Sequence, residues 1–356
     1  MPDWTQSMQQ TYEYYVVDPL TWKDKELLTT VRSCSITRDS ESSTLGSASI
    51  NVVDSIGECY IRIYLVTIQN GIKEKHPLGT FLVQTPSSSY NGKMRDVSMD
   101  AYTPLLELKE SPPPLGYSKL KGDNIMLTAY QLVREHARAP VVEVTNSKTL
   151  YSNFVANTDD TWLTFISDLI SNAKYQFDLD EMGRILFAPQ QDVASLQPVW
   201  TYTDDDESIL YPDITTNHDL YGIPNVVEII YSNGTDYYYS TITNNDVNSP
   251  TSVPNRGRKI VYRETNPSLT GVDDSISIQR RLDEYAKQTL RDVSTIEYSV
   301  TYQHGYCPVR VGDCVRLNYK RSGLTNVKAK VISQTIKCDT SCQVSERAVF
   351  TKKLWG

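Results

Sequence analysis

Four histidines are the side chains in this sequence best suited to acid–base chemistry near neutral pH. They are His76, His136, His218 and His304, and they form no H-x-x-x-H pair. His304 lies three residues before Cys307, which makes these two the nearest Cys–His candidate for nucleophilic catalysis, although Gly305 and Pro308 beside them favour an ordinary turn. The sequence also has no G-x-S-x-G elbow, phosphate loop or dinucleotide fingerprint. It therefore predicts no catalytic, cofactor-binding or metal site, and a protein that is not an enzyme.

Cysteines and clustered acids are the remaining groups that could bind a metal. The six cysteines are Cys34, Cys59, Cys307, Cys314, Cys338 and Cys342. The last four follow C-x6-C and C-x3-C spacings, whereas structural zinc sites usually have two to four residues between ligands at both ends. A zinc site and a Cys338–Cys342 disulfide stay open as alternatives, and free thiols in a reducing compartment are favoured. The acidic run 204–207 lacks the alternation and glycine of a calcium loop, which predicts a solvated loop.

Composition excludes several classes of protein. A chain of 356 residues has room for two or three domains, and 39% hydrophobic with 22% charged residues is typical of a folded domain. The net charge of −8 predicts a surface that does not hold nucleic acid. Tyrosine outnumbers phenylalanine by 24 to 6, which suits strands and assembly surfaces.

Strand patterns dominate the first third of the sequence. Residues 60–68 form the strongest strand pattern, and residues 76–108 indicate a strand, a polar turn at Ser87–Gly92, a second strand and an exit. About six strands with regular turns predict an antiparallel β-barrel-like module over residues 27–112. Residues 1–26 are polar and aromatic, and we expect them to form an N-terminal arm outside the core.

The middle of the sequence changes period. Consecutive prolines at 112–114 mark a boundary, because proline continues neither a ladder nor a helix. Residues 124–138 and 158–173 have apolar side chains at helical spacing, with Thr158 as an N-cap. A short hairpin follows them. These elements predict an α+β domain over residues 113–190.

The last part of the sequence returns to strands. Residues 191–224 are predicted to be a loop-rich linker, and residues 225–356 a second β-barrel module interrupted by a helix at 276–293. Within it, residues 244–257 form a long polar stretch, either mobile or used in interactions. The predicted fold class is mixed but mainly β: two antiparallel β-barrel-like modules, an inserted α+β domain and an additional helix-containing segment.

Five stretches in order resemble the tail hub proteins of bacteriophages. The stretch PLGTFLV to MDAYTPLLELK (77–109) resembles part of the first hub barrel, as does TTVRSCSITRD to YLVTIQNG (29–71). DDTWLTFISDLISNAKYQFDLDEMGRILFAPQ (159–190) resembles the helix and hairpin of the hub α/β domain. ISIQRRLDEYAKQTL to CVRLNY (276–319) resembles the helix that leads into the second barrel, and VKAKVISQTIKC to TKKL (327–354) its final hairpin.

This resemblance implies a homotrimer in which two related barrels per subunit form a pseudo-six-fold ring. Such a ring adapts the hexameric tail tube to a three-fold spike or fibre, and DNA passes through its channel without specific binding. The implied partners are the tail tube or distal tail protein above, a spike, fibre or tail-tip protein below, and the tape measure protein. The implied location is the virion, at the tail baseplate or tail tip, after assembly in the host cytoplasm.

Two other functions stay open. The protein could be a tail-associated cell-wall hydrolase, a peptidase or a glycosidase, or a carbohydrate-binding tip that recognises a receptor. Longer hub relatives continue into a peptidase or lysozyme domain, and the end of this sequence at Gly356 predicts that such domains lie on other chains. No secretory signal follows Met1, and no apolar stretch approaches the roughly 18 residues of a membrane helix.

Overall fold

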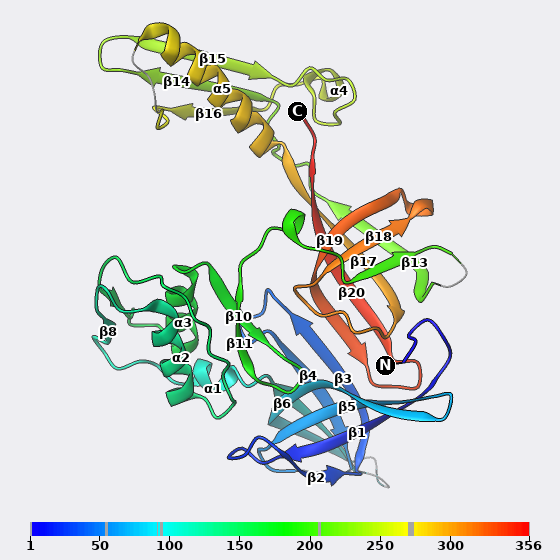
Figure 1. Ribbon diagram of the computed structural model, residues 1–356. Coiled ribbons are helices and arrows are strands. Elements are labelled where there is room, and N and C mark those ends of the chain that lie inside the picture. The colour runs from blue at the N-terminus through cyan, green and yellow to red at the C-terminus, as the bar shows by residue number, and fades with distance from the viewer. Residues whose placement is uncertain are drawn as a thin grey trace. The chain divides into compact units, whose positions relative to one another are not determined.

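Strands dominate the structure, a computed structural model (Figure 1). Strands hold 46% of the residues and helices 16%, which confirms the prediction of a mixed, mainly β protein. The residues that the structure describes are 2–53, 56–90, 92, 95–205, 208–269 and 274–355.

The chain divides into two compact units. Unit 1 comprises Met1–Ile214 and Thr301–Ala348, and unit 2 comprises Thr215–Val300 and Val349–Gly356. The chain passes from one unit to the other within three strands, which are β13 (Leu210–His218), β17 (Thr295–Gly305) and β20 (Gln343–Lys353).

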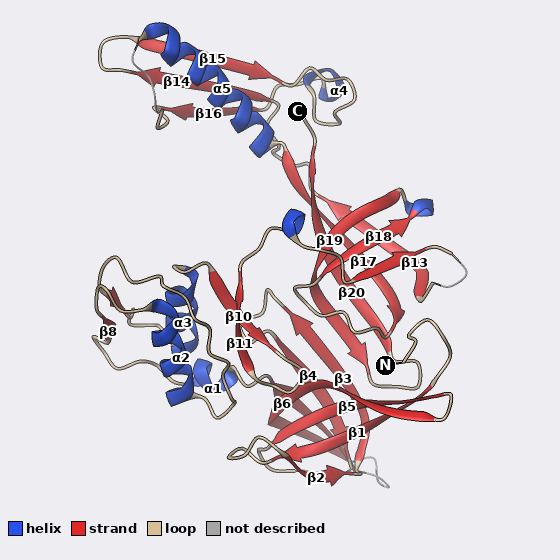
Figure 2. Ribbon diagram, in the orientation of Figure 1, coloured by secondary structure: helices blue, strands red, loops and turns tan. Residues whose placement is uncertain are grey.

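One large sheet organises unit 1. Among the described residues it has 13 strands in the order β13-β17-β20-β19-β3-β4-β7-β6-β5-β1-β2, with β18 beside β19 and β12 beside β18. Figure 2 shows strands in red. The other strands of this sheet are β1 (Gln9–Val17), β2 (Asp24–Leu28), β3 (Val31–Asp39), β4 (Gly46–Val52), β5 (Tyr60–Gln69), β6 (Ile72–Tyr90), β7 (Arg95–Tyr102), β12 (Trp200–Thr203), β18 (Cys314–Tyr319) and β19 (Leu324–Lys337).

The pairing of β3 with β19 joins the two predicted β modules. The two strands are antiparallel, and Ile36 lies opposite Ile336, both of them buried. Separate modules were predicted because alternation within a strand shows which face is apolar but not which distant strand pairs with it.

The N-terminal residues differ from the predicted arm. Strand β1 lies between β2 and β5, with Tyr14 opposite Ile63, and both Tyr14 and Val17 are buried. The Tyr12 hydroxyl donates to the carbonyl oxygen of Asp339 at 2.9 Å. A tyrosine can bury its ring while its hydroxyl forms a hydrogen bond. A buried strand rich in tyrosine can therefore have the same composition as an exposed polar arm, which is why the sequence predicted an arm.

The predicted turn at Ser87–Gly92 is wrong for its first part. After a register shift between Val83 and Pro86, β6 continues to Tyr90 and pairs with β7, so that Ser87 lies opposite Ser98. Asn91 lies outside the described residues. Backbone hydrogen bonds between strands need no particular side chain, so the exposed serines continue the pairing of β6 with β7.

The α+β part of unit 1 follows its predicted order. It contains α1 (Leu106–Glu110), α2 (Ile125–His136), α3 (Trp162–Ser171), the hairpin β10 (Tyr175–Leu179) and β11 (Ile185–Pro189), and the short pair β8 (Ser118–Lys119) and β9 (Phe154–Val155). Thr161, not Thr158, is the N-cap of α3, because its hydroxyl accepts from the Thr164 backbone N–H in a capping box.

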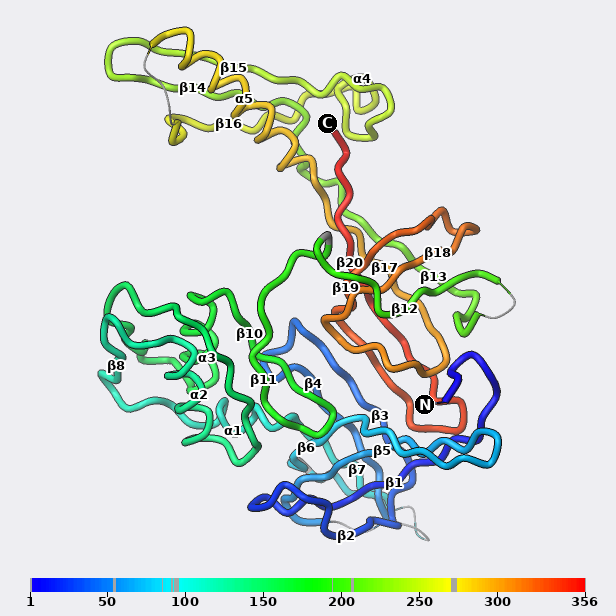
Figure 3. Tube along the Cα trace, in the orientation of Figure 1, coloured from blue at the N-terminus to red at the C-terminus, as the bar shows by residue number. Residues whose placement is uncertain are grey.

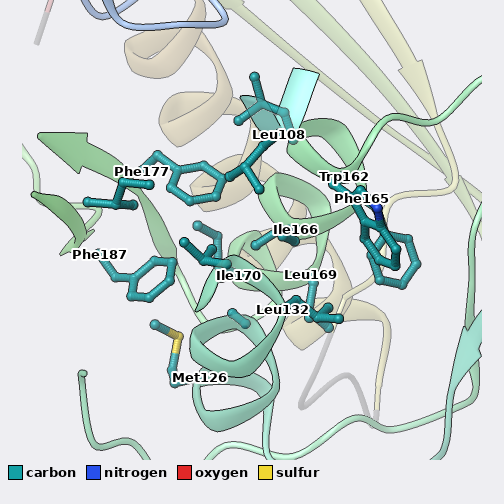
Figure 4. Packing of buried hydrophobic residues seen from close by; sticks show 14 of the residues in the cluster. Leu108, Met126, Leu132, Trp162, Phe165, Ile166, Leu169, Ile170, Phe177 and Phe187 are labelled. Carbon is teal, nitrogen blue, oxygen red and sulfur yellow. The ribbon is translucent and has the colours of Figure 1, made fainter. Parts of the chain in front are cut away.

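The core of this part lies between α2, α3 and the hairpin (Figure 4). Phe165, Ile166 and Leu169 project from one face of α3 and are fully buried. Phe177 and Phe187 lie opposite each other on β10 and β11, with ring centroids 5.6 Å apart. The apolar residues of α3 recur with a period of 3.6 residues and those of the hairpin with a period of two. Because each period is visible in the sequence, both elements could be predicted from it.

Unit 2 contains a separate three-stranded sheet covered on one face by α5 (Ser275–Val293). Its strands are β14 (Val226–Ser232), β15 (Tyr237–Thr243) and β16 (Val261–Thr265). Leu282, Ala286 and Leu290 of α5 pack against Val227 and Ile229. The apolar stripe of a long helix needs a sheet face to cover, and these strands supply it.

These findings correct two predicted boundaries. The predicted linker 191–224 contains β12 and β13, which belong to the large sheet. The predicted module 225–356 is not continuous, because β14, β15 and β16 form their own sheet with α5. Alternation alone gives β14 and β18 the same appearance in the sequence, so it could not assign them to different sheets.

The polar stretch 244–257 contains the short helix α4 (Val253–Arg256), which is labelled on the trace in Figure 3. Asn244 of this stretch is fully buried, and so is Asn225. The Asn225 side-chain amide donates to the carbonyl oxygens of Thr251 and Arg258, both at 3.0 Å. Asparagine, serine and threonine therefore form a hydrogen-bonded core here in place of an apolar one.

Candidate functional site

A cavity lies in unit 1, where four segments of the chain meet. It has a volume of about 550 Å³. The turn after β3, strand β6, the β10–β11 hairpin and the turn before β18 line it. A cavity of this size is typical of small-molecule sites, so its charged groups decide what it can do.

Two arginines bind the acidic hairpin across this cavity. The Arg310 Nε lies 2.7 Å from a Glu181 carboxylate oxygen, and its Nη2 lies 3.7 Å from Asp178. Arg38 of β3 lies 3.8 Å from the same Glu181. Arg38 also donates to the carbonyl oxygen of Leu78 at 2.7 Å. The ion pairs thus connect β3, the hairpin and the turn before β18.

Two carboxyl groups at the cavity have raised pKa values. Burial raises the pKa of Asp178, and the nearby Arg310 guanidinium opposes this effect. Burial also raises the pKa of Asp313, which accepts a hydrogen bond from the Arg310 backbone N–H at 2.8 Å. A raised carboxyl pKa can serve a general acid. Here, however, both carboxyls accept backbone hydrogen bonds that shape their own turn or strand, as Asp178 does from Leu179.

A buried arginine fixes the tip of the same hairpin. Arg62 of β5 is only 1% exposed, and its Nη1 lies 2.7 Å from Asp24. The carbonyl oxygen of Met182 accepts from Arg62 at 3.0 Å and from the Trp22 indole N–H at 2.8 Å. A buried guanidinium is stable only when its donors are paired, and this one uses the hairpin tip as a partner.

Gly183 allows the hairpin tip to approach β6 closely. Its φ is +74°, and a Cβ built there would lie 2.6 Å from Cβ of Thr80. Any other residue would therefore clash with a stiff β-branched side chain as well as strain the turn.

A second polar cluster is buried inside the sheet of unit 1. The Nε2 of His304 lies 3.3 Å from Glu346 and 3.1 Å from the Tyr202 hydroxyl. The Tyr302 hydroxyl donates to Glu346 at 2.7 Å, and Gln334 donates to the other carboxylate oxygen. All five side chains are at most 1% exposed. We call these residues the buried network.

The buried network holds a charged pair. Burial lowers the pKa of His304, but contacts with Cys307 and Glu346 outweigh it and raise that pKa to about 10. Burial raises the pKa of Glu346, and the hydrogen bond and charge of His304 outweigh it, so that pKa lies below its ordinary value. The imidazolium and the carboxylate therefore stabilise each other near neutral pH.

The structure brings His304 and Cys307 together, with Nδ1 and Sγ 3.9 Å apart. Both side chains are buried, and Nδ1 also lies 2.6 Å from the carbonyl oxygen of Gly305. The other histidines pack on aromatic rings elsewhere: His76 on Trp4, His136 on Trp162 and His218 on Tyr298.

Sequence reasoning missed Arg62, Gln334 and Glu346. Each occupies an inward-facing position of a strand whose neighbours at i±2 are apolar or aromatic, as Glu346 does between Val344 and Ala348. A charged or amide side chain at an apolar position of an alternating strand was the available signal.

All six cysteines are free thiols. Within the described ranges, no group of three or more histidine, cysteine or acidic side chains is placed to hold a metal ion. Of the helices that the structure describes, none is both long and apolar enough to span a membrane. The acidic run predicted as a solvated loop lies partly at 206–207, outside the described residues.

Comparison with known proteins shows which solved structures share this fold. No protein-family model and no curated protein sequence matches the chain. In structure, the chain is similar to the tail protein of Neisseria meningitidis MC58, with a TM-score of 0.62 and 13% identity over 96% of this chain and 97% of that one. It is also similar to the 43 kDa tail protein of prophage MuSo2 from Shewanella oneidensis, with a TM-score of 0.60 and 11% identity over 95% and 98%. The chain has the fold of phage tail proteins.

A component of the E. coli type VI secretion system has a related structure. Its TM-score is 0.50 at 10% identity, over 92% of this chain and 76% of that one. That protein is described as structurally similar to the T4 bacteriophage tail proteins gp27 and gp5. In this tail-protein fold, the charged groups at the cavity join segments of one chain.

Proposed function

We propose that the chain is a structural tail protein that forms the hub at the distal end of the tail tube. Three copies form a ring in which two β modules per copy match the hexameric tube above, and the ring offers three-fold symmetry to a spike or fibre below. The tape measure protein is a further partner. The protein is part of the virion, at the baseplate or tail tip, after assembly in the host cytoplasm.

The observation that carries this proposal is the likeness to two tail proteins over nearly the full length of all three chains. The order of the hub-like sequence stretches agrees with it. The charged side chains also support a structural role, because Arg38, Arg62 and Arg310 bind other parts of unit 1. Such ties would keep a subunit rigid within a loaded ring.

The ring would enclose a channel for DNA. The net charge of −8 supports passage without specific binding, because an acidic surface repels phosphates. The proposed role includes no catalysis, cofactor or metal. The raised pKa values of Asp178 and Asp313 keep a cell-wall hydrolase as the alternative to be tested.

Two experiments test the proposal. Light scattering of the purified protein should give three times the mass of one 40.4 kDa chain, and negative-stain images should show rings. Gold-labelled antibodies should mark the distal end of the tail on particles. Label along the whole tube, or on no particle, would contradict the proposed position.

Purified peptidoglycan tests the alternative. We expect no soluble muropeptides or reducing sugars after incubation with the protein. Product release that disappears in Asp178→Asn and Asp313→Asn variants would establish a hydrolase instead.

A further inference from the structure

The sheet of unit 2 ends in two edge strands. Its strand order is β15-β14-β16, so β15 and β16 are the edge strands among the described residues. Strand β15 has the sequence YYYSTIT, with neither charge nor proline. Natural proteins usually protect a lone edge with charges, proline or a bulge, as the charges of β2 (DKELL) do in unit 1. An unprotected edge indicates a partner strand.

The hydrogen-bond phase shows which groups β15 leaves unpaired. Asn244 N–H donates to the carbonyl oxygen of Asn225 at 2.8 Å, just beyond the paired ends of β15 and β14. Antiparallel ladders alternate, so the even-numbered residues of β15 bond to β14. Tyr237, Tyr239 and Thr241 therefore direct their N–H and C=O groups to the free edge. The Tyr239 carbonyl oxygen has this direction but is already paired, since it accepts from Gln279 of α5 at 3.0 Å. A partner strand would therefore use the three N–H groups and the carbonyl oxygens of Tyr237 and Thr241.

The same reasoning applies to β16. The carbonyl oxygen of Ile260 accepts from Asn225 at 2.9 Å, and Asn266 N–H donates to Ile230 at 2.8 Å. Even-numbered residues thus face β14, which leaves the N–H and C=O groups of Val261, Arg263 and Thr265 at the other edge. Both edges hence offer alternate residues as donors and acceptors.

Side chains at the two edges are complementary. Tyr237 and Tyr239 are 68% and 63% exposed, on the sheet face opposite α5. The exposed Arg263 and Val261 lie on that same face of the sheet, and Arg263 lies 2.7 Å from Glu228. A tyrosine ring can cover an arginine or a valine across a strand pair. The edge of β15 is uncharged, and the charge of Arg263 on β16 is balanced by Glu228. Pairing the two edges therefore brings no like charges together.

We infer that β15 of one copy of this chain pairs with β16 of a second copy. This contact is heterologous, because each copy pairs with one neighbour through β15 and with another through β16. Heterologous contacts form closed rings when the rotation between copies closes. The number of copies, three, rests on the proposed function. The pairing of β15 with β16 rests on the two edges themselves.

Proline at an edge-facing position tests the pairing. Thr241→Pro and Thr265→Pro each remove one N–H that faces outward, at a place where an edge strand tolerates proline. We expect each to raise the concentration for half-maximal association at least about tenfold, measured by analytical ultracentrifugation. Thr241→Val and Thr265→Val are the matched controls, since they keep the N–H and the β-branched shape and should associate like wild type. Circular dichroism confirms that all four variants fold.

Mixing the two proline variants identifies the type of contact. Thr265→Pro keeps an intact β15 and Thr241→Pro keeps an intact β16, so the mixture should form a dimer that neither variant forms alone. In hydrogen exchange, amides of Tyr239 and Thr241 should exchange slowly in the wild-type assembly and quickly in Thr265→Pro, although β15 is unchanged there.

Three results would overturn the inference. An unchanged oligomer in Thr241→Pro, an unchanged oligomer in Thr265→Pro, or a wild-type chain that stays monomeric would each exclude the β15–β16 contact. The first two leave the proposed ring intact, held by other surfaces. Antibody labelling of the tail tip tests the proposed function independently of all three.

Discussion

Replacing Glu346 by glutamine changes one charge at the centre of the buried network. Glutamine keeps the size of the side chain but removes the carboxylate that His304 faces at 3.3 Å and Tyr302 at 2.7 Å. Both His304 and Glu346 are at most 1% exposed, so water cannot replace the lost charge. The variant must bury an unpaired imidazolium or fold with a neutral His304.

The expected cost follows from that burial. Removing one partner of a buried, hydrogen-bonded ion pair typically destabilises a protein by about 3–5 kcal/mol. We expect the free energy of unfolding of unit 1 to fall by about this amount near pH 6. The exposed carboxyl of Glu26, also in unit 1, provides a matched control, and Glu26→Gln should change stability by less than about 0.5 kcal/mol.

The cost should depend on pH in a defined direction. The folded pKa of His304, about 10, lies above its ordinary 6.5, so its contribution is complete below pH 6.5 and disappears as the pH rises to 10. The folded pKa of Glu346 lies below its ordinary 4.5, so its contribution is present above pH 4.5 and is lost in acid. The wild-type advantage over Glu346→Gln should therefore be larger at pH 6 than at pH 9.5.

Urea unfolding followed by tryptophan fluorescence at pH 6 and pH 9.5 measures this difference. A difference between wild type and variant below about 1 kcal/mol at pH 6 would refute the buried charge pair. So would an equal difference at both pH values, because a purely steric role of Glu346 has no pH dependence. NMR titration of the His304 ring provides an independent measurement of its pKa.

Three further changes test other contacts of unit 1. Gly183→Ala should lower stability by about 2–4 kcal/mol in urea unfolding, since strain and the clash with Thr80 add, whereas Gly116→Ala, with a similar φ of +77° and open space at its Cβ, should cost only about 1 kcal/mol. Phe165→Ala removes a fully buried ring from α3 and should cost about 3–5 kcal/mol by the same measurement. Arg310→Met should increase proteolytic cleavage in the β10–β11 hairpin, because Glu181 and Asp178 lose a partner; an unchanged cleavage rate would show that the ion pairs do not hold the hairpin.

Several elements could be predicted from the sequence because their signals are local. Helices α2, α3 and α5 have apolar residues at a 3.6-residue period, and the hairpins β10–β11 and β14–β15 alternate around short polar turns. Hydrogen bonds within a helix or hairpin join residues that are close in sequence, so a window of 10 to 20 residues contains the information.

The candidate site could be predicted only in part. His304 and Cys307 attracted notice as a pair, yet the partner that decides the state of His304 is Glu346, 42 residues further along the chain on β20. Arg62 has its partners on β2 and at the tip of the β10–β11 hairpin. The sequence marks such residues as charges within apolar strands and gives no sign of which distant group pairs with them.

By itself, then, the sequence determined the mainly β class, the order of helices and hairpins, and the absence of familiar catalytic motifs. Tertiary structure alone decided that β1 is a sheet strand, that β3 pairs with β19, and that β14–β16 form a sheet of their own. The physical reason is that the sequence of a strand specifies its buried face but not its hydrogen-bonding partner. Alternation sets which face is buried, whereas the neighbour that completes the backbone hydrogen bonds is chosen by the packing of the whole chain.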